Sequence, residues 1–207
     1  MSRPHPPLPD PSRRAACART LAGVLAGVGA CLQAARGSPA GGGAAGAAGG
    51  ATADDVKAAY LHKFAGYVDW PASAFATTST PFVVAVVGAE AVAESLSRVV
   101  AGRPVQGRPM VVRRLARPSE LTPDVTLLFV GRDAARELPA WSSAVTGRPV
   151  MVVTDAPGGL AGGASIAFVE SDARVRFEAA PAVAEANGLR LNARLLAVAE
   201  RVVGSAP

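Results

Sequence analysis

Three short, almost wholly apolar runs constrain the fold more than any other feature of this sequence. They are "PFVVAVVG" at 81–88, "VTLLFVG" at 125–131 and "RPVMVVTD" at 148–155. A strand with one solvated face alternates apolar and polar residues, whereas a strand covered on both faces is apolar throughout. The runs therefore predict central strands of a sheet with helices on both sides.

The segments around these runs predict how the strands are connected. Residues 89–102 have the pattern of a helix that stops at Gly102, residues 109–115 that of a strand, and residues 132–145 that of a helix broken at Pro139. Strands that alternate with helices imply crossover connections, and these connections make a mostly parallel sheet.

The last third of the chain adds antiparallel structure. "ASIAFVE" and "RVRFEA" are separated by a polar turn at Ser171 and Asp172, which is hairpin spacing. Residues 182–203 then predict a closing helix, whose apolar stripe is Leu191, Leu195, Leu196, Ala199 and Val202. We therefore expect an α/β fold: a three-layer α/β/α sandwich with a mixed, mostly parallel sheet and a C-terminal antiparallel hairpin.

The stretch "VKAAYLHKFAGYVDWP" at 56–71 predicts the first helix of the domain. Thr52 and Asp55 have the spacing of a capping box, and Pro71 disfavours helical geometry at Trp70. The apolar stripe expected to face the core consists of Val56, Tyr60, Leu61, Phe64, Tyr67 and Val68. His62 falls opposite this stripe, where a solvated histidine is a better interpretation than a general base.

The first fifty residues have little to bury in a core. They include "GSPAGGGAAGAAGGA", in which large apolar side chains are almost absent. Arginines precede the apolar run Thr20–Ala35, which is typical of an export signal. We expect 1–53 to be an export signal and a Gly/Ala-rich leader, 54–203 to be the folded domain and 204–207 to be a tail.

Three outcomes stay open for this leader. In the first, cleavage after Ala40 or Ala53 releases the mature protein. In the second, "VGAC" is a lipobox and Cys31 is lipidated. In the third, the segment is the tail of a cytosolic protein. Both cysteines, Cys17 and Cys31, lie in this part of the chain, so the domain is expected to contain no disulfide and no thiolate site.

Charge argues against a nucleic-acid partner. The chain has a formal net charge of +5, but residues 1–50 carry five Arg and one Asp, while the remainder carries sixteen Lys and Arg against fifteen Asp and Glu. A nearly neutral domain without a basic stripe is not typical of nucleic-acid binding.

No segment predicts a catalytic, cofactor-binding or metal-binding residue. The loop "DAPGGLAGG" at 155–163 lacks the lysine of a phosphate-binding loop and leads into a strand instead of a helix. Asp124, Asp133 and Asp155 could be read as a carboxylate cluster for magnesium, but residues at strand and helix ends also serve as caps and turns.

One resemblance covers most of the domain. The pattern of 56–71 resembles the opening helix of the YfiR family of exported bacterial proteins, through Lys57, Tyr60, Leu61, Lys63, Phe64, Tyr67, Val68, Trp70 and Pro71. "PFVVAVVG", "GRPVQGRPMVVRRL" and "DVTLLFVG" are similar to the family's next segments, in the same order. The closing block is similar at Gly162, Gly163, Ile166, Phe168, Arg176, Phe177, Glu178, Gly188, Leu189, Leu195 and Leu196. The similarity extends over about 54–203.

The sequence also departs from the family pattern at two places. Members often have Cys-His where this chain has Val125 and Thr126, so a family disulfide there is absent. The closing block usually has an asparagine where this chain has Ala180. The first departure puts redox control in doubt, and the second alters a local cap.

The resemblance implies a function in regulation. It implies a periplasmic repressor that binds the periplasmic portion of an inner-membrane diguanylate cyclase and lowers cyclic di-GMP and biofilm formation. It also implies a second partner, an OmpA-like outer-membrane lipoprotein that sequesters the repressor. No enzymatic activity and no cofactor are implied, and a homodimer stays open.

Two further hypotheses complete the interpretation. Trp70, Arg174 and Arg176 are the candidate partner-binding residues, because aromatic and arginine side chains are favoured interface anchors. The alternative function is a periplasmic sensor that binds a small molecule near Gly88, Gly131 and the 155–163 loop, where the strands end.

Overall fold

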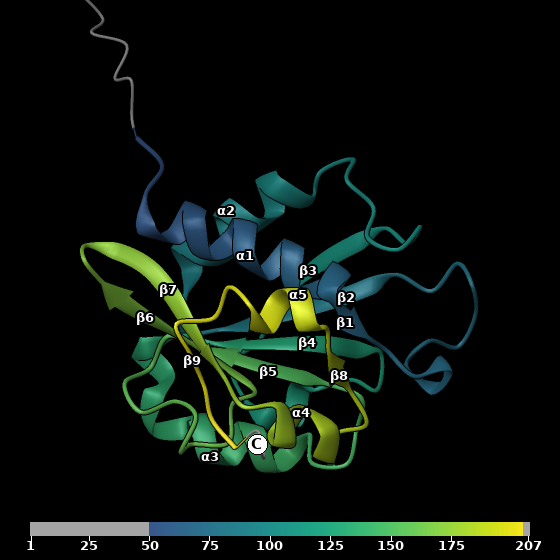
Figure 1. Cartoon of the computed structure of the whole chain (residues 1–207). Coiled ribbons are helices and arrows are strands. Elements are labelled where there is room, and N and C mark those ends of the chain that lie inside the picture. The colour runs from purple at the N-terminus through teal and green to yellow at the C-terminus, as the bar shows by residue number, and fades with distance from the viewer. Residues whose placement is uncertain (1–49, 205–207) are drawn as a thin grey trace, which may run out of the picture. The chain divides into compact units, whose positions relative to one another are not determined.

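The computed structural model describes residues 50–204 of the chain (Figure 1). The predictions for the export signal, its cleavage and Cys31 concern residues outside that range. The main sheet has seven strands in the order β3-β2-β4-β5-β6-β7-β9. Its strands are β2 (Phe82–Val87), β3 (Met110–Arg114), β4 (Val125–Val130), β5 (Met151–Thr154), β6 (Ile166–Ser171), β7 (Arg174–Ala179) and β9 (Arg201–Val202).

The predicted α/β class is confirmed. The strands from β3 to β6 are parallel to their neighbours, β6 and β7 form an antiparallel hairpin, and β7 is parallel to β9. Figure 1 shows α1 (Ala53–Tyr67) and α2 (Glu90–Val100) on one face of the sheet and α3 (Leu138–Ala144) on the other. The three apolar runs became β2, β4 and β5, which are buried along their whole length.

Each face of the sheet has its own core. On the side of α1 and α2, Phe64 and Leu61 pack with Phe129, Phe168 and other side chains of the sheet. On the opposite side, the buried Trp141 of α3 packs with alternate residues of β2, β4 and β5. Because successive side chains of a strand point to opposite faces, one apolar run serves both cores.

Helix α1 begins as predicted. The Thr52 side chain accepts a hydrogen bond from the Asp55 backbone, and the Asp55 carboxylate accepts one from the Thr52 backbone, so the capping box is complete. The helix ends at Tyr67, earlier than expected, because the next residues, Val68–Asp69, form strand β1, which pairs with β8 (Arg190–Leu191).

The predicted core-facing stripe of α1 was partly wrong. The buried residues of α1 are Lys57, Ala58, Leu61, Phe64 and Ala65. Tyr67 is 42% exposed, and His62 is half-buried with an Nε2 atom that has no hydrogen-bond partner. The helix is rotated from the expected orientation so that the small Ala58 and Ala65 face the core together with Leu61, which allows close packing.

The region of Pro139 confirms the predicted break. The segment is divided into a 3-10 helix η3 (Arg132–Glu137) and α3, and Pro139 lies in the first turn of α3, where its missing N–H costs no hydrogen bond. Two further 3-10 turns are η1 (Ala72–Ala74) and η2 (Pro118–Glu120). The β6–β7 hairpin turns at Asp172 and Ala173, both of which have positive φ.

The predicted closing helix was wrong. Its segment contains α4 (Pro181–Ala186), β8, α5 (Ala193–Leu196) and β9. Gly188 has a φ of 72°, a left-handed conformation that ends α4, and the Asn192 side chain caps α5. Pairing of β8 with β1 and of β9 with β7 prevents one continuous helix. No helix in residues 50–204 has the length and apolar character needed to cross a bilayer.

Candidate functional site

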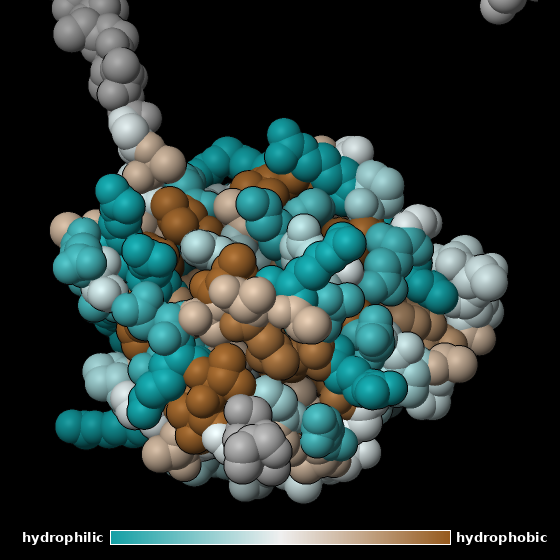
Figure 2. All heavy atoms as spheres, viewed as in Figure 1, coloured by the Kyte–Doolittle hydropathy of each residue, from teal (hydrophilic) through white to brown (hydrophobic). Residues whose placement is uncertain are grey.

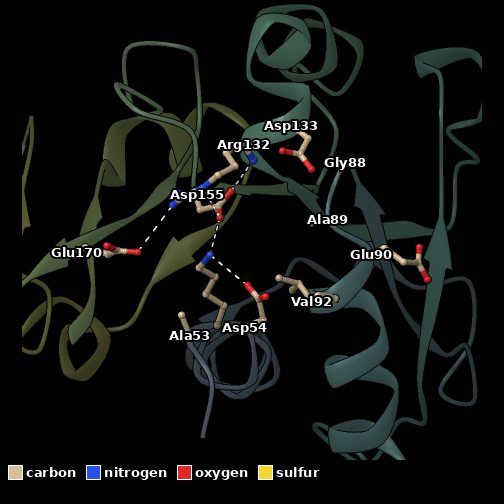
Figure 3. Close-up of a pocket in the computed structure, with 12 residues that line it drawn as sticks. Ala53, Asp54, Gly88, Ala89, Glu90, Val92, Arg132, Asp133, Asp155 and Glu170 are labelled. Carbon is tan, nitrogen blue, oxygen red and sulfur yellow. Dashed lines mark hydrogen bonds and ion pairs between the residues drawn. The ribbon is translucent and has the colours of Figure 1, made fainter. Parts of the chain in front are cut away.

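A cleft opens where the strand order of the sheet reverses. From β2 the chain passes through α2 to β3 on one side, and later places β4 on the other side of β2. Ligands of open α/β sheets bind beyond the carboxyl ends of the strands at such a switch point. In this chain the cleft has a volume of about 460 Å³ and is lined by residues of α1, α2, η3 and the ends of β2 and β5 (Figure 3).

A buried ion pair lies at the bottom of the cleft. The Nζ atom of Lys57 donates to Asp155 Oδ2 at 2.6 Å, and the two side chains are only 7% and 6% exposed. Lys57 is in the second turn of α1 and also lies 3.4 Å from Asp54, which is one helical turn away. Asp155 is the first residue after β5. The pair thus joins α1 to the carboxyl edge of the sheet.

Arg132 completes the surroundings of Asp155. Its backbone N–H donates to Asp155 Oδ1 at 2.7 Å, and its Nε atom lies 3.5 Å from Oδ2. Its Nη2 atom is 3.9 Å from Glu170 Oε1 across the cleft. Both oxygens of the buried carboxylate therefore have partners, as a charge removed from water requires.

Two glycines allow the ends of β2 and β4 to approach one another beside the cleft. Gly88 follows β2 with a φ of 60°, and a Cβ atom at this position would lie 2.8 Å from Ala134 Cβ. A Cβ atom at Gly131, after β4, would overlap the Gly88 carbonyl oxygen. Both positions need glycine because the strand ends approach one another closely.

The lining of the cleft is more acidic than basic. Against Lys57 and Arg132 it carries five carboxylates, namely Asp54, Glu90, Asp133, Asp155 and Glu170. The lining includes no histidine, serine or cysteine. The arrangement can hold a polar ligand through side-chain hydrogen bonds.

The carboxylates considered for magnesium do not form one site. Asp155 is paired with Lys57, Asp133 lines the cleft, and Asp124 forms an ion pair with Arg113 at 2.8 Å. Hydrogen bonds from Arg113 and Thr122 lower the pKa of Asp124. Within residues 50–204 no cluster of three or more histidine, cysteine or carboxylate side chains has a metal-binding arrangement.

The glycine loop after β5 packs against α3. A Cβ atom on Gly162 would lie 2.6 Å from Leu138 Cδ2, and one on Gly163 would lie 2.9 Å from Ser142 Cβ. Gly163 has a φ of 91°. Close packing and positive φ explain these glycines without a phosphate ligand.

The three predicted partner-binding residues lie in two places. Trp70 lies near the start of β2: its ring centroid is 4.9 Å from that of Phe82, and its indole N–H donates to the Ala65 carbonyl oxygen at 3.1 Å. It also lines a hollow of about 450 Å³ together with Phe75 and Arg108. Trp70 therefore has a packing role and an accessible edge.

Arg174 and Arg176 lie on β7 instead. Arg174 is exposed next to the hairpin turn, and Arg176 Nε is 3.8 Å from Glu200 Oε2. Strand alternation directs both arginines away from the face where Phe177 packs under α1. The structure thus separates Trp70 from the arginine pair.

Sequence reasoning missed the Lys57–Asp155 pair. The two residues are 98 positions apart, and nothing in the patterns that contain them links one to the other. One signal was available: a lysine between apolar and alanine positions of an amphipathic helix needs a partner if that part of the helix is buried.

The chain matches one family model over the folded region. Residues 54–200 match the model described as YfiR/HmsC-like, a span that contains the cleft, the ion pair and nearly all of the sheet. No curated protein matches the chain. The matched span is more than half of the chain, and the chain belongs to the YfiR/HmsC-like family.

Proposed function

We propose that this protein is an exported regulator that binds the periplasmic portion of an inner-membrane diguanylate cyclase and represses it. Repression would lower cyclic di-GMP and biofilm formation. The observation that carries the proposal is the family match across residues 54–200, because resemblance to this family implies a periplasmic regulator of a diguanylate cyclase. A repressor acts by binding the inactive state of its target more tightly than the active state.

The direct test is binding. The domain of residues 50–204, which keeps the Thr52 cap of α1, is mixed with the purified periplasmic portion of each membrane diguanylate cyclase that the organism encodes, and complexes are detected by co-purification. We expect one cyclase to be retained, with an unrelated periplasmic domain as the negative control. Retention of none of them would contradict the proposal.

The candidate contacts of this complex are Trp70, Arg174 and Arg176. Arg174→Ala and Arg176→Ala alter partly or fully exposed side chains, so we expect weaker retention of the cyclase by a folded protein. Trp70→Ala also removes packing against Phe82, so circular dichroism must show that the variant is folded before its binding is interpreted. Full retention by all three variants would remove them from the interface.

Export is a separate part of the proposal. It rests on the arginine-flanked apolar run Thr20–Ala35. Mass spectrometry of protein recovered from cells should show a mature chain that starts between residues 31 and 54. A lipid on Cys31 would establish the lipoprotein form, and a cytosolic chain that keeps Met1 would contradict export. An OmpA-like outer-membrane lipoprotein is the proposed second partner, and the same co-purification tests it.

A second candidate function is sensing of a small molecule, and the cleft at the switch point favours it. A polar ligand that binds there raises the melting temperature by mass action. We would measure thermal melts of wild type and Arg132→Ala with a panel of charged metabolites. A compound that stabilises wild type more than the variant supports a sensor, and no stabilisation by any compound contradicts it.

A further inference from the structure

A further hollow lies beside residues 60–67 of α1, whereas the cleft lies beside residues 53–57 at the start of this helix. This further hollow is a groove of about 430 Å³ between α1, β7 and α5. Its floor is made of Phe64, Phe177 and Leu195, which are 1%, 1% and 3% exposed. The floor of this α1–α5 groove is therefore part of the hydrophobic core.

The walls of the α1–α5 groove are held in place by packing and hydrogen bonds. The Tyr60 ring lies 5.6 Å from both Phe64 and Phe177, whose own centroids are 5.0 Å apart. The Asn192 backbone N–H donates to the Tyr67 carbonyl oxygen at 3.0 Å, which joins the start of α5 to the end of α1. Side chains and backbone that are already fixed in this way lose little conformational freedom when a partner binds.

Exposed apolar side chains border the groove. Tyr67 is 42% exposed and Val198 is 64% exposed, and they are two of the four large apolar side chains that are exposed in residues 50–204. Figure 2 shows apolar residues around α5 with hydrophilic residues on either side. Both border residues line the same groove, so the apolar exposure is concentrated at one place.

The charges at the groove are all positive. Lys63 and Arg194 line it and are exposed, and no carboxylate is among its lining residues. Neither cation takes part in an ion pair with any residue of 50–204. Most other arginines of the described domain have a carboxylate or backbone carbonyl partner, so this pair of free cations has charge available for an acidic partner.

From these observations we infer that the α1–α5 groove binds an acidic segment of the partner protein that inserts at least one large apolar side chain between Tyr67 and Val198. The inference rests on the proposed function, since it names the surface through which the repressor holds the periplasmic portion of the cyclase. Opposite charges on the two sides of an interface accelerate encounter and select the partner. Tyrosine and arginine are the side chains that most often dominate binding energy.

A second copy of this chain fits the groove less well. In a two-fold symmetric dimer the same patch occurs on both sides of the interface. Lys63 and Arg194 of one copy would then face the same cations of the other, and like charges repel one another. An acidic segment pairs with both cations and leaves no such repulsion.

The test compares two double variants with the same change in net charge. Lys63→Glu/Arg194→Glu reverses the charge of the groove, and Arg103→Glu/Arg136→Glu reverses two exposed, unpaired arginines elsewhere. Binding of the cyclase periplasmic portion is measured by calorimetry at two salt concentrations. We expect the groove variant to bind at least about tenfold more weakly and the control variant to bind within about twofold of wild type.

An uncharged variant separates the apolar contact from the charge. Tyr67→Ala should weaken binding by about tenfold while the salt dependence stays as in wild type. Circular dichroism and melting temperature verify that each variant is folded. We expect all of them to fold, because the side chains of Lys63, Arg194 and Tyr67 are exposed.

The outcomes distinguish the inference from the proposed function. If wild type binds a cyclase and the groove variants bind equally well, the groove inference is overturned and the proposed function stands. If wild type binds none of the cyclases, both are overturned. A wild-type dimer in sedimentation velocity that Lys63→Glu/Arg194→Glu dissociates would assign the groove to a second copy and overturn the acidic partner.

Discussion

The two lysines of this protein lie six residues apart on α1 and differ in burial and in ion pairing. Lys57 is 7% exposed and is held by a buried carboxylate, whereas Lys63 is exposed and has no ion-pair partner within residues 50–204. The first lies in an acidic cleft at the carboxyl edge of the sheet, and the second borders an apolar groove. Under our proposal, one helix uses one cation for stability and another for recognition.

The energetics of the two regions follow from this difference. A buried charge that loses its partner keeps its full desolvation cost, so the cleft should be intolerant of substitution. An exposed charge interacts weakly within its own chain, so the groove should tolerate substitution in the isolated protein. The groove variants should show their effect only when a partner is present.

The largest effect is expected at the ion pair. Lys57→Met leaves Asp155 buried with only its contacts to Arg132, so we expect a loss of about 3 to 5 kcal/mol in the free energy of unfolding. Urea denaturation measures it. Lys63→Met is the matched control, and an equal loss in both variants would contradict the contrast between the two lysines.

A smaller effect is expected beside the cleft, where the ends of β2 and β4 meet. Gly131→Ala places a Cβ atom against the Gly88 carbonyl oxygen, and the strand ends must separate to relieve the overlap. We expect a loss of about 1 to 3 kcal/mol in urea denaturation, typical of overpacking. Gly66→Ala is the control, because a Cβ atom at Gly66 would lie 4.0 Å from Val105 Cγ1, its nearest neighbour. Gly102→Ala is unsuitable because Gly102 has a φ of 67°, which disfavours alanine. Equal stability of the Gly131 and Gly66 variants would argue against close contact of the strand ends.

The pH dependence of stability tests the start of α1, the helix that both regions share. A hydrogen bond from Ser95, followed by those from Thr52, lowers the pKa of Asp55 from 3.8 to about 2. A carboxyl whose pKa is lower in the folded state stabilises the fold above its unfolded pKa, and this contribution is lost as pH falls through the folded pKa. We therefore expect a loss of stability between pH 4 and 2 that is smaller in Asp55→Asn, which keeps only the contributions of other carboxyls such as Asp124. Parallel pH profiles of the two proteins would contradict the role of this carboxyl.

The smallest effect is expected at the groove itself. Val198→Ser changes a side chain that is 64% exposed, so the free energy of unfolding should shift by no more than about 0.5 kcal/mol. Leu195→Ala, three residues earlier, removes a side chain that is 3% exposed and should cost about 2 to 5 kcal/mol. Urea melts of this pair define where the groove ends and the core begins.

Patterns with a local physical cause could be predicted from the sequence. The apolar run 82–87 requires cover on both faces, the Thr52 and Asp55 spacing caps a helix, and Pro139 starts a new one. The family resemblance was also confirmed by the match over 54–200.

The features that depend on distant contacts could not be predicted. The rotation of α1 that exposes Tyr67 is set by the packing of Ala58 and Ala65 in the core. The segment predicted as one closing helix forms short elements instead, because β8 pairs with β1 and β9 pairs with β7. The candidate cleft was located by the strand-end argument at Gly88 and Gly131, but its ion pair needed the tertiary structure.

The central claim is that this domain restrains a membrane diguanylate cyclase. The most direct measurement is the cyclic di-GMP level of a strain that lacks the gene, complemented with wild type, with Lys63→Glu/Arg194→Glu or with Arg103→Glu/Arg136→Glu. We predict that deletion raises cyclic di-GMP, that wild type and the Arg103/Arg136 control restore the low level, and that the groove variant does not. An unchanged cyclic di-GMP level in the deletion strain would contradict the claim.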